Sequence, residues 1–596
     1  MRPVVFDKTV GWLHPASGRR GVVIAGAHGF EDLCSRRFLT LMAREMAAAG
    51  LPVLQFDYPG CGDAAGDHTE PGQVAAWVAS IASAIDQLKS ETGVADVLVI
   101  GFRLGALLAP AAVAGRNDVA GLALLAPPSS GKGYVREMTG LSRMIDAALP
   151  PYPDAEPFDG MAAAGFRISA ETAADLRMFE WRDRLAISQK LDLLLMPPQV
   201  TPAHSDLAER FAADGGSARI ESFDGFSRLM STPTASDIPQ ATLDTVVRWA
   251  AGLNRPGATV SVSADREQLV LEGDGYVEQP LVLEPAPEIC GVLCMPVRTE
   301  VSDEVVLILN AGAIPHIGWA RGAVDMARAL ARQGIASMRI DLPGLGQSET
   351  PSEKRQFLYD KRARDDVIQI VDWLERRGFE RVCAIGICAG AYQGFHAARR
   401  DPRIAHVAMV NPLCFSWNSS YALEMGLSKI RDNARAPLAP DMDQAAEMDP
   451  AASAKVGPSL KSSVSKVGRR MLRRSLEISK SGLSRLSSAR PSKGGSVERW
   501  MRDLTKRGTE VLVVSCEGDL SHEEIARHFG PDGERLRRMS GVTMALIPAA
   551  DHTLTPLHAR VQLTDHVARW LSSADAAPAS TGTRSSQPSN IAGEAP

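Results

Sequence analysis

The sequence predicts an α/β protein with two tandem domains, each a mostly parallel sheet flanked by helices. Short runs of valine, isoleucine and leucine alternate with longer segments of helical periodicity, which is typical of a parallel sheet covered on both faces. Three sequence blocks also occur twice in the same order, which indicates that the alternating unit is duplicated. A stretch rich in Val, Leu and Glu at 258–300 predicts antiparallel strands at the start of the second unit.

The duplication is visible in three pairs of segments, which lie 284 or 285 residues apart. The pairs are VVIAGAHGF (22–30) and VLILNAGAI (306–314), GLPVLQFDYPGCG (50–62) and GIASMRIDLPGLG (334–346), and VLVIGFRLG (97–105) and VCAIGICAG (382–390). An offset this long fits a repeated unit of ~250 residues and excludes a short solenoid repeat.

Strands and helices alternate strictly in the first unit. The predicted elements, in order, are a strand at 22–25, a helix at 38–49, a strand at 53–56, a helix at 75–88, a strand at 97–100 and a helix at 106–114. The first helix ends at Gly50, because glycine commonly terminates helices, and the second strand ends at Asp57. The second unit repeats this alternation from Val305 to Ala398.

Composition shifts set the domain boundaries. The segment LNRPGA at 253–258 separates a first domain, 1–254, from a second, 255–572. Residues 573–596 are small, polar and proline-containing, which predicts a disordered tail. The second domain also carries a long insertion at 413–505.

Composition and charge exclude several classes of protein. The 596 residues are 45% hydrophobic, and 65 Lys and Arg against 70 Asp and Glu give a net charge of −5. This balance argues against a dedicated nucleic-acid binder, and the composition excludes collagen-like, coiled-coil and wholly disordered chains. No window approaches the ~20 apolar residues of a transmembrane helix, and the N-terminus lacks the apolar core of a signal peptide. We therefore expect a cytoplasmic protein.

The eight cysteines form neither a disulfide framework nor a metal-binding pattern. Cys290 and Cys294 lie ~13 Å apart along a predicted strand, which is too far for two ligands of one metal. The glycine-rich turns match neither a P-loop nor the G-x-G-x-x-G motif of dinucleotide-binding proteins. We therefore expect no cofactor and no metal.

The most distinctive motif is GICAG at 386–390, between a predicted strand and a predicted helix. This is the strand–turn–helix setting of a nucleophile elbow, G-x-S-x-G, with cysteine in place of serine. The two glycines let the backbone pack closely around a strained residue, whose side chain is pushed into the open. The motif therefore predicts Cys388 as a catalytic nucleophile.

An acid and a histidine follow the elbow in the order that a catalytic triad of this type requires. Asp519 ends the buried strand in VLVVSCEGD, and His552 follows the strand in LIPAADHTLTP. Taken singly, Asp519 would be a turn residue and His552 a polar loop residue. Together with Cys388 they predict a triad in which His552 takes the thiol proton and Asp519 orients the imidazole.

An oxyanion hole requires two backbone N–H groups beside the nucleophile. One should be that of Ala389, which directly follows the predicted nucleophile. The other should come from the loop 310–313 after the first central strand, where we favour Gly312. Asp57 and Asp341, in the two D-x-P-G-x-G turns, are expected to form turns and not to act in catalysis.

These motifs resemble those of the α/β-hydrolase superfamily. The segments DLPGLGQS, GICAG, SCEGD and ADHTLTP are similar to the serine aminopeptidase-like (S33) branch, which includes hydrolases associated with exopolysaccharide and exosortase gene clusters. A Cys-Asp-His triad is also similar to that of dienelactone hydrolase. The resemblance covers 300–415 and 505–572, and it implies ester, thioester or amide acyl transfer through a covalent acyl-enzyme. Nothing in the sequence supports a peptide as the substrate.

The first unit departs from this pattern at each catalytic position. Its elbow reads GFRLG, so Arg103 replaces the nucleophile. Matching the two units places Val200 at the position of Asp519 and Ser227 near that of His552. We therefore expect a pseudo-hydrolase that serves as a scaffold for the second unit. The alternative is an anion-binding site, in which Arg103 at a helix N-terminus faces a carboxylate or phosphate.

Two classes of function remain open. The first is an enzyme with a cysteine nucleophile that hydrolyses an ester, a thioester or a related acyl bond. An acyltransferase in polysaccharide or lipid-linked metabolism would use the same acyl-enzyme. The second class is a non-catalytic scaffold or binding protein in which both units are degenerate. The complete set of Cys388, Asp519 and His552 favours the enzyme.

The insertion 413–505 occupies the position where this fold commonly carries a lid over the nucleophile. Within it, residues 459–493 contain ten Lys and Arg and a single acid, with apolar residues at helical spacing. This pattern predicts a basic amphipathic helix. Its charged face is either simply solvated or contacts an anionic membrane through 459–490, where it would deliver amphiphilic acyl substrates.

Overall fold

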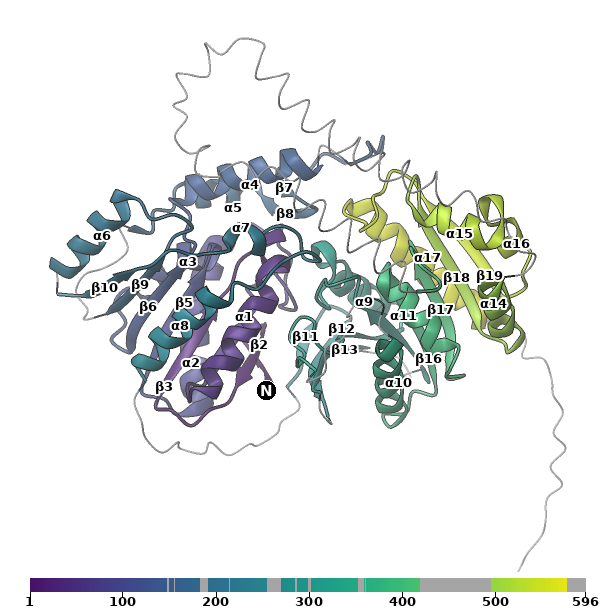
Figure 1. Ribbon diagram of the computed structural model, residues 1–596, viewed down its shortest axis with the longest axis horizontal. Helices are drawn as coiled ribbons and strands as arrows, with labels where there is room; N and C mark the ends of the chain where they lie inside the picture. The colour runs from purple at the N-terminus through teal and green to yellow at the C-terminus, as the bar shows by residue number, and fades with distance from the viewer. Residues whose placement is uncertain are drawn as a thin grey trace, which may run out of the picture.

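The structure is a computed structural model that describes residues 1–575 except 147–148, 155, 183–190, 214, 255–268, 285–286, 298–301, 352–358, 360 and 418–494. The described chain forms two α/β units that lie side by side, each built around its own sheet (Figure 1). The first unit is drawn in purple to blue and the second in teal to yellow. Both sheets are mostly parallel, as the alternation of strands and helices predicts.

The first sheet has eight strands in the order β1-β2-β4-β3-β5-β6-β9-β10. The strands are β1 (Arg2–Phe6), β2 (Thr9–His14), β3 (Arg20–Ala25), β4 (Val53–Phe56), β5 (Asp96–Phe102), β6 (Val119–Leu125), β9 (Asp192–Met196) and β10 (Ser217–Ile220). Strand β2 pairs antiparallel with β1 and β4, and the pairs from β4 to β10 are parallel. Strands β7 (Gly160–Ala163) and β8 (Phe166–Ser169) form a separate hairpin.

Helices cover both faces of the first sheet. They are α1 (Phe30–Ala48), α2 (Gln73–Thr92), α3 (Leu104–Val113), α4 (Gly131–Ile145), α5 (Ala170–Arg177), α6 (Pro202–Ala213), α7 (Phe226–Leu229) and α8 (Gln240–Gly252). Side chains of α2 and α3 belong to the core on one face, and those of α1 and α8 to the core on the other. In α2, buried Trp77, Ile81 and Leu88 recur at helical spacing, which turns one stripe of the helix toward the sheet.

The second sheet has nine strands in the order β11-β12-β13-β15-β14-β16-β17-β18-β19. The strands are β11 (Leu271–Gly273), β12 (Tyr276–Leu283), β13 (Ile289–Pro296), β14 (Glu304–Leu309), β15 (Ala336–Asp341), β16 (Arg381–Ile387), β17 (Ile404–Val410), β18 (Glu510–Cys516) and β19 (Val542–Ile547). Apart from β11, this order matches the first sheet strand for strand. The predicted antiparallel start of the unit is confirmed by the pairing of β11, β12 and β13.

The helices of the second unit repeat the arrangement of the first. They are α9 (Gly322–Arg332), α10 (Lys361–Glu375), α11 (Ala389–Ala398), α14 (Ser496–Lys506), α15 (Ser521–Phe529), α16 (Glu534–Arg537) and α17 (Leu557–Asp575). Helices α10, α11 and α14 contribute to the core on one face of the sheet, and α9 and α17 to the core on the other. Both faces of the parallel strands are therefore buried, which explains their continuous apolar runs.

The N-terminal hairpin of β1 and β2 is an element that the sequence patterns did not predict. Its turn residues, Asp7 and Lys8, both have positive φ (43° and 61°), as in a type I′ turn. Because the usual Asn-Gly or Asp-Gly signal is absent, the local sequence does not mark this turn. Helix α1 also begins earlier than predicted, at Phe30, directly after Gly29.

Several predictions concern residues outside the described part of the chain. The insertion is described only at 413–417 and 495–505, so a lid over Cys388 is not confirmed. The basic segment 459–490 and nearly all of the predicted tail 573–596 also lie outside the described residues. Within the described ranges, no helix combines the length and the apolar character needed to cross a bilayer.

The two units pack through a pseudo-two-fold interface. Each unit contributes its D-x-P-G-x-G turn and its first long helix, and the contacts occur in pairs related by the 284-residue offset of the repeat. Arg37 donates to the carbonyl of Gly346 (3.1 Å) and Arg321 to that of Gly62 (2.9 Å), while Arg44 donates to Gln347 (3.1 Å) and Arg328 to Asp63 (2.9 Å). The repeats therefore pack as two copies of one subunit would pack in a symmetric dimer.

A histidine with two carboxylate partners lies at the centre of this interface. The ring of His316 contacts Asp63 of the first unit through Nε2 (2.6 Å) and Asp341 of the second through Nδ1 (2.7 Å), and all three side chains are fully buried. Burial alone would lower the pKa of His316, but the charges of the two carboxylates raise it to about 10. The imidazolium form therefore joins the two units at neutral pH.

We expect the thermal stability of the protein to fall as the pH rises from about 7 to about 10. The pKa of His316 is about 10 in the folded state and 6.5 for an unperturbed histidine, so the folded state binds the extra proton between these values. The stabilisation is complete below about pH 6.5 and is lost as the pH rises through about 10. Calorimetric Tm values across this range test the expectation. His316→Gln should flatten the decline, and an unchanged slope in that variant would contradict it.

Candidate active site

Cys388 lies in a tight turn between β16 and α11, at the carboxyl edge of the second sheet. Its backbone angles are φ 57° and ψ −112°, which are rare for a residue other than glycine. A Cβ atom at Gly386 would lie 2.2 Å from the carbonyl carbon of Gly390, and one at Gly390 would lie 2.7 Å from the carbonyl oxygen of Asn310. The predicted turn therefore forms. Both glycines are needed because the backbone segments around Cys388 lie too close together for a side chain at either position.

Asp519 and His552 come together at the same edge of the sheet, after β18 and β19. The Nδ1 atom of His552 and the Oδ2 atom of Asp519 are 2.8 Å apart. The backbone N–H of Ser521 donates to the other oxygen of Asp519 (2.8 Å). Both carboxylate oxygens are thus held, and the acid fixes the orientation of the imidazole ring.

Burial and charge act in opposite directions on this pair. Burial alone would lower the pKa of His552, but hydrogen bonding with Asp519 and the nearby Cys388 raise it to about 10. Burial would likewise raise the pKa of Asp519, but the hydrogen bond from His552 holds it below its usual range. The Nε2 atom of His552 is buried and has no partner of hydrogen-bond geometry within the described chain.

Tyr359 is a neighbour of Cys388 that no sequence motif marks. Its Oη atom lies 3.7 Å from the Sγ atom of Cys388. Its ring stacks on Trp417, with centroids 4.4 Å apart, and meets Tyr392 edge to face at 5.3 Å. Burial and the nearby Cys388 raise the pKa of Tyr359, so its hydroxyl stays protonated and can donate to the sulfur. The three rings form an aromatic wall beside the thiol.

Asn411 links the two loops that carry the acid and the histidine. Its Oδ1 atom accepts the backbone N–H of Cys516 (2.8 Å), and its Nδ2 atom donates to the carbonyl of His552 (2.9 Å). The backbone of Asn411 has a positive φ of 46°, which asparagine tolerates better than most residues. Asn411 therefore braces the end of β18 against the histidine loop.

The two residues predicted for the oxyanion hole border the same turn. Ala389 is the first residue of α11, and Gly312 has a positive φ of 64° in the loop after β14. Asn310 begins this loop, and its carbonyl oxygen lies against Gly390. The loop that carries Gly312 therefore starts beside the helix that follows Cys388.

Arg103 adopts nearly the same backbone conformation as Cys388, with φ 53° and ψ −108°. Its buried guanidinium donates to Glu31 (2.7 Å) and to the carbonyl of Ala126 (3.2 Å), and it also pairs with Glu137. Burial raises the pKa of Glu31, while Arg103 opposes that shift. Two carboxylates already compensate the charge of Arg103, and this argues for a structural role and against the anion-binding alternative.

The other two positions of the first unit hold no catalytic group either. Val200, at the position of the acid, is exposed after β9. Ser227, near the position of the histidine, is exposed in the short helix α7. The first unit therefore has the backbone conformation of the elbow but lacks the side chains of a catalytic triad at the matching positions.

Comparison with protein families agrees with the duplicated architecture. The model described as serine aminopeptidase, S33, matches residues 18–157, and the model described as the alpha/beta hydrolase family matches residues 306–565. The chain therefore contains two alpha/beta hydrolase domains in tandem. The S33 model falls on the first unit, although the sequence resemblance to that branch is drawn from motifs of the second.

Solved alpha/beta hydrolases cover about half of the hydrolase chain. A serine hydrolase homologue from Coxiella burnetii is 13% identical over 49% of this chain and 97% of its own, with a TM-score of 0.28. The Est1E protein of Butyrivibrio proteoclasticus with bound ferulic acid is 16% identical over 42% of this chain and 97% of its own, with a TM-score of 0.31. No curated protein matches the chain.

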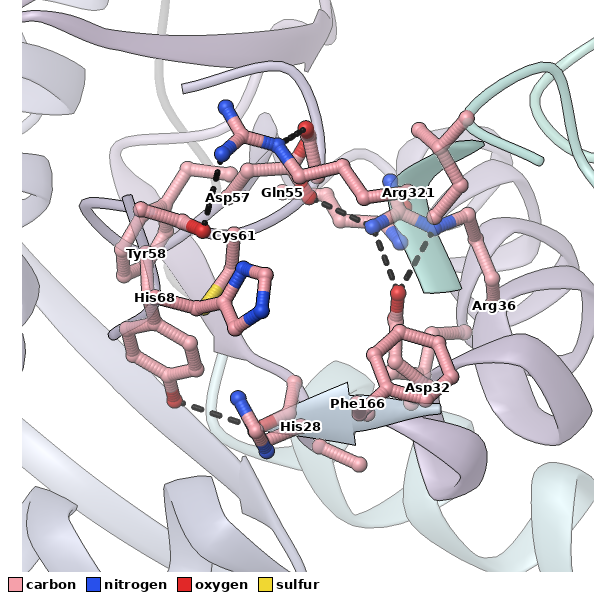
Figure 2. A pocket seen from close by; sticks show the side chains of 18 residues that line it. His28, Asp32, Arg36, Gln55, Asp57, Tyr58, Cys61, His68, Phe166 and Arg321 are labelled. Carbon is pink, nitrogen blue, oxygen red and sulfur yellow. Dashed lines mark hydrogen bonds and ion pairs between the residues drawn. The ribbon is translucent and has the colours of Figure 1, made fainter. Parts of the chain in front are cut away.

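The first hydrolase unit contains a polar cavity at the edge of the interface (Figure 2). The rings of His28 and His68 face its centre, and Phe166 closes one side. Arg36 is paired with Asp32 (2.7 Å) and with Asp57 (2.6 Å). Burial lowers the pKa of His28 to about 3, so its imidazole is neutral.

This cavity is too small for a substrate. The space that water can occupy in it measures about 30 Å³, which suffices for about two ordered molecules. Its charged groups also compensate one another, so it offers no net charge to a ligand. Within the described residues, no group of three or more His, Cys, Asp and Glu is arranged to hold a metal ion.

Proposed function

We propose that the second hydrolase unit cleaves an ester or thioester through an acyl-enzyme on Cys388. The observation that carries the proposal is the 2.8 Å contact between His552 and Asp519 at the sheet edge where the strained Cys388 turn also lies. This combination orients an imidazole toward a thiol that is partly exposed. Interaction with Asp519 and Cys388 raises the pKa of His552, which favours the imidazolium that forms when the ring takes a proton from the thiol.

The proposed reaction has two steps with His552 as the proton carrier. In the first, the thiol proton moves to Nε2 of His552, and the sulfur of Cys388 attacks the substrate carbonyl. The N–H groups of Ala389 and Gly312 stabilise the oxyanion, and the leaving group departs with the proton from His552. In the second step, water attacks the acyl-enzyme, gives a proton to His552 and releases the acid together with the free thiol. An acceptor hydroxyl in place of water would make the enzyme an acyltransferase.

Mass spectrometry of the intact protein tests this proposal. The full-length chain is incubated with a panel of p-nitrophenyl esters and acyl-thioesters of different chain lengths, and peptide mapping then locates any added mass. One acyl group on the peptide that contains Cys388 is the expected result. Acyl transfer to an added alcohol would favour the acyltransferase. Absence of acylation across the panel would favour the scaffold alternative.

Replacing Asp519 with asparagine should lower kcat for a p-nitrophenyl ester by roughly 10²–10⁴-fold. The amide can still accept a hydrogen bond, but it neither stabilises the imidazolium nor selects the required tautomer of His552. The fold should survive, because asparagine is isosteric with aspartate. Steady-state kinetics and a circular dichroism spectrum test both parts. Asp551→Asn, one residue before the histidine, is the matched control and should change kcat little.

The predictions for the insertion extend this proposal. A lid at 413–505 would restrict access to Cys388, and contact of 459–490 with an anionic membrane would bring amphiphilic acyl substrates to it. Vesicle co-sedimentation with and without anionic lipid tests the membrane contact. Binding that ignores lipid charge would leave only a solvated basic face.

A further inference from the structure

Asp63 belongs to the first unit, but its side chain ends inside the second. One carboxylate oxygen contacts Nε2 of His316 (2.6 Å), and the other accepts from Nη2 of Arg339 (3.0 Å). The side chains of all three residues are fully buried. A buried carboxylate with two cationic partners is held in one position, because any movement would leave a charge unpaired.

From His316 the hydrogen bonds continue to the loop predicted for the oxyanion hole. The backbone N–H and the ring Nδ1 of His316 contact the two oxygens of Asp341 (both 2.7 Å). Asp341 accepts from Nδ2 of Asn310 (3.0 Å), and the same Nδ2 donates to the carbonyl of Ile314 (3.0 Å). Asn310 and Ile314 are the two ends of the loop segment 310–314. The side chain of Asn310 therefore joins the two ends of the segment that contains Gly312, and it is bonded to the same carboxylate as His316.

No equivalent series of hydrogen bonds among the described residues runs from the second unit to the corresponding loop of the first. In the first unit, the residue at the repeat position of His316 is Asp32, which pairs with Arg36 of its own helix. The residue at the repeat position of Asp63 is Gln347, which accepts a hydrogen bond from the Thr40 hydroxyl (2.9 Å). The hydrogen bonds from Asp63 through His316 to Asp341 therefore break the pseudo-symmetry of the interface. They end in the second unit, which keeps the predicted catalytic side chains.

We propose that the first unit acts in catalysis by the second, with Asp63 as a positioning residue for the oxyanion loop. This inference rests on the proposed acyl-enzyme function. Asp63 fixes His316, which fixes Asp341 and the ends of the segment 310–314, and so aims the N–H of Gly312 at the position of the developing oxyanion. Because a donor displaced by ~1 Å loses much of its effect, the first unit is a required part of the active site.

Asp63→Asn tests the inference with the full-length protein and a p-nitrophenyl ester. The amide keeps the shape of the side chain but removes the charge that holds His316. We expect kcat to fall by about 10–100-fold with KM changed less than twofold, because the oxyanion forms only after the substrate has bound. Asp67→Asn is the matched control, since Asp67 lies in the same turn, is 61% exposed and should leave both constants unchanged.

A second measurement separates positioning from loss of structure. Iodoacetamide alkylates a thiolate without forming an oxyanion, so the rate of alkylation of Cys388 should be the same in Asp63→Asn and in the unmodified protein. Arg44→Met removes an interface hydrogen bond that is not part of the connection from Asp63 to Asn310, so it reports the effect of a weakened interface and should keep kcat. An unchanged kcat in Asp63→Asn overturns the inference. A parallel loss of kcat and alkylation overturns it as well, because it assigns Asp63 a structural role. Inactivity of the unmodified protein toward all acyl substrates instead defeats the proposed function on which the inference rests.

Discussion

Cys388→Ala is expected to abolish acyl labelling and to lower kcat for esters and thioesters by about 10⁴-fold or more. Without the sulfur there is no nucleophile for the covalent step, and the His552–Asp519 pair cannot replace it. The backbone turn should survive, because alanine accepts the same positive φ no worse than cysteine does. Intact-mass spectrometry and steady-state kinetics on the same preparations measure both effects.

Cys61→Ala is the matched control for this experiment. Cys61 is the other partly exposed cysteine among those that the structure describes, and it lies in the first unit, away from His552. Its replacement should leave labelling and turnover intact. Full activity in Cys388→Ala, or an acyl group on a residue of the first unit, would refute the assignment of the nucleophile.

Arg103→Met is expected to lower the free energy of unfolding of the first unit by about 3–5 kcal/mol. The substitution keeps much of the apolar volume but leaves the carboxylates of Glu31 and Glu137 without their buried cation. Because the pKa of Glu31 is already raised by burial, the loss of Arg103 should favour its protonation further. Urea unfolding of the unmodified protein and the variant, followed by tryptophan fluorescence, measures the difference.

Two further variants give the stability prediction its controls. Arg538→Met breaks an ion pair with Glu534 in which both side chains are more than half exposed (75% and 57%), and should cost no more than about 1 kcal/mol. Arg103→Met combined with Glu31→Gln should recover part of the lost stability, since the second change removes one unpaired buried charge. If Arg103→Met instead raised KM only for anionic substrates and left stability unchanged, the anion-binding alternative would be correct.

The alternation of strands and helices and the position of the elbow could be predicted because their signals are local. Buried parallel strands such as β5 and β16 appear as continuous apolar runs, and the glycines at 386 and 390 mark a turn that no larger residue could form. The β1–β2 hairpin could not be predicted, because its turn uses Asp7 and Lys8 in conformations usually taken by asparagine and glycine. Strands and helices could be found from the periodicity of apolar residues. The Asp7–Lys8 turn, in contrast, takes its backbone conformation from the pairing of β1 with β2.

Some residues of the candidate site could likewise be predicted from the sequence, and others could not. Cys388, Asp519 and His552 were predicted because each follows a strand, and parallel strands bring such residues to one edge of a sheet. Tyr359 and Trp417 could not be predicted as neighbours of Cys388, because their contacts depend on how the segments around α10 and β17 pack. The pairing of Arg103 with Glu31 and Glu137 could not be predicted either, because these acids come from two other helices; it argues against the anion-binding alternative, which stays a prediction to be tested.

The amino-acid sequence was enough to predict the duplicated fold, the loss of catalytic side chains in the first unit and the turn-forming role of Asp57 and Asp341. Both aspartates do accept the backbone N–H that closes their turns, from Asp63 and Gln347. The contact between Asp63 and His316, which are 253 residues apart, is visible only in the folded protein. A turn is closed by residues a few positions away in the sequence, whereas the partner of a buried charge depends on how the two units pack against each other.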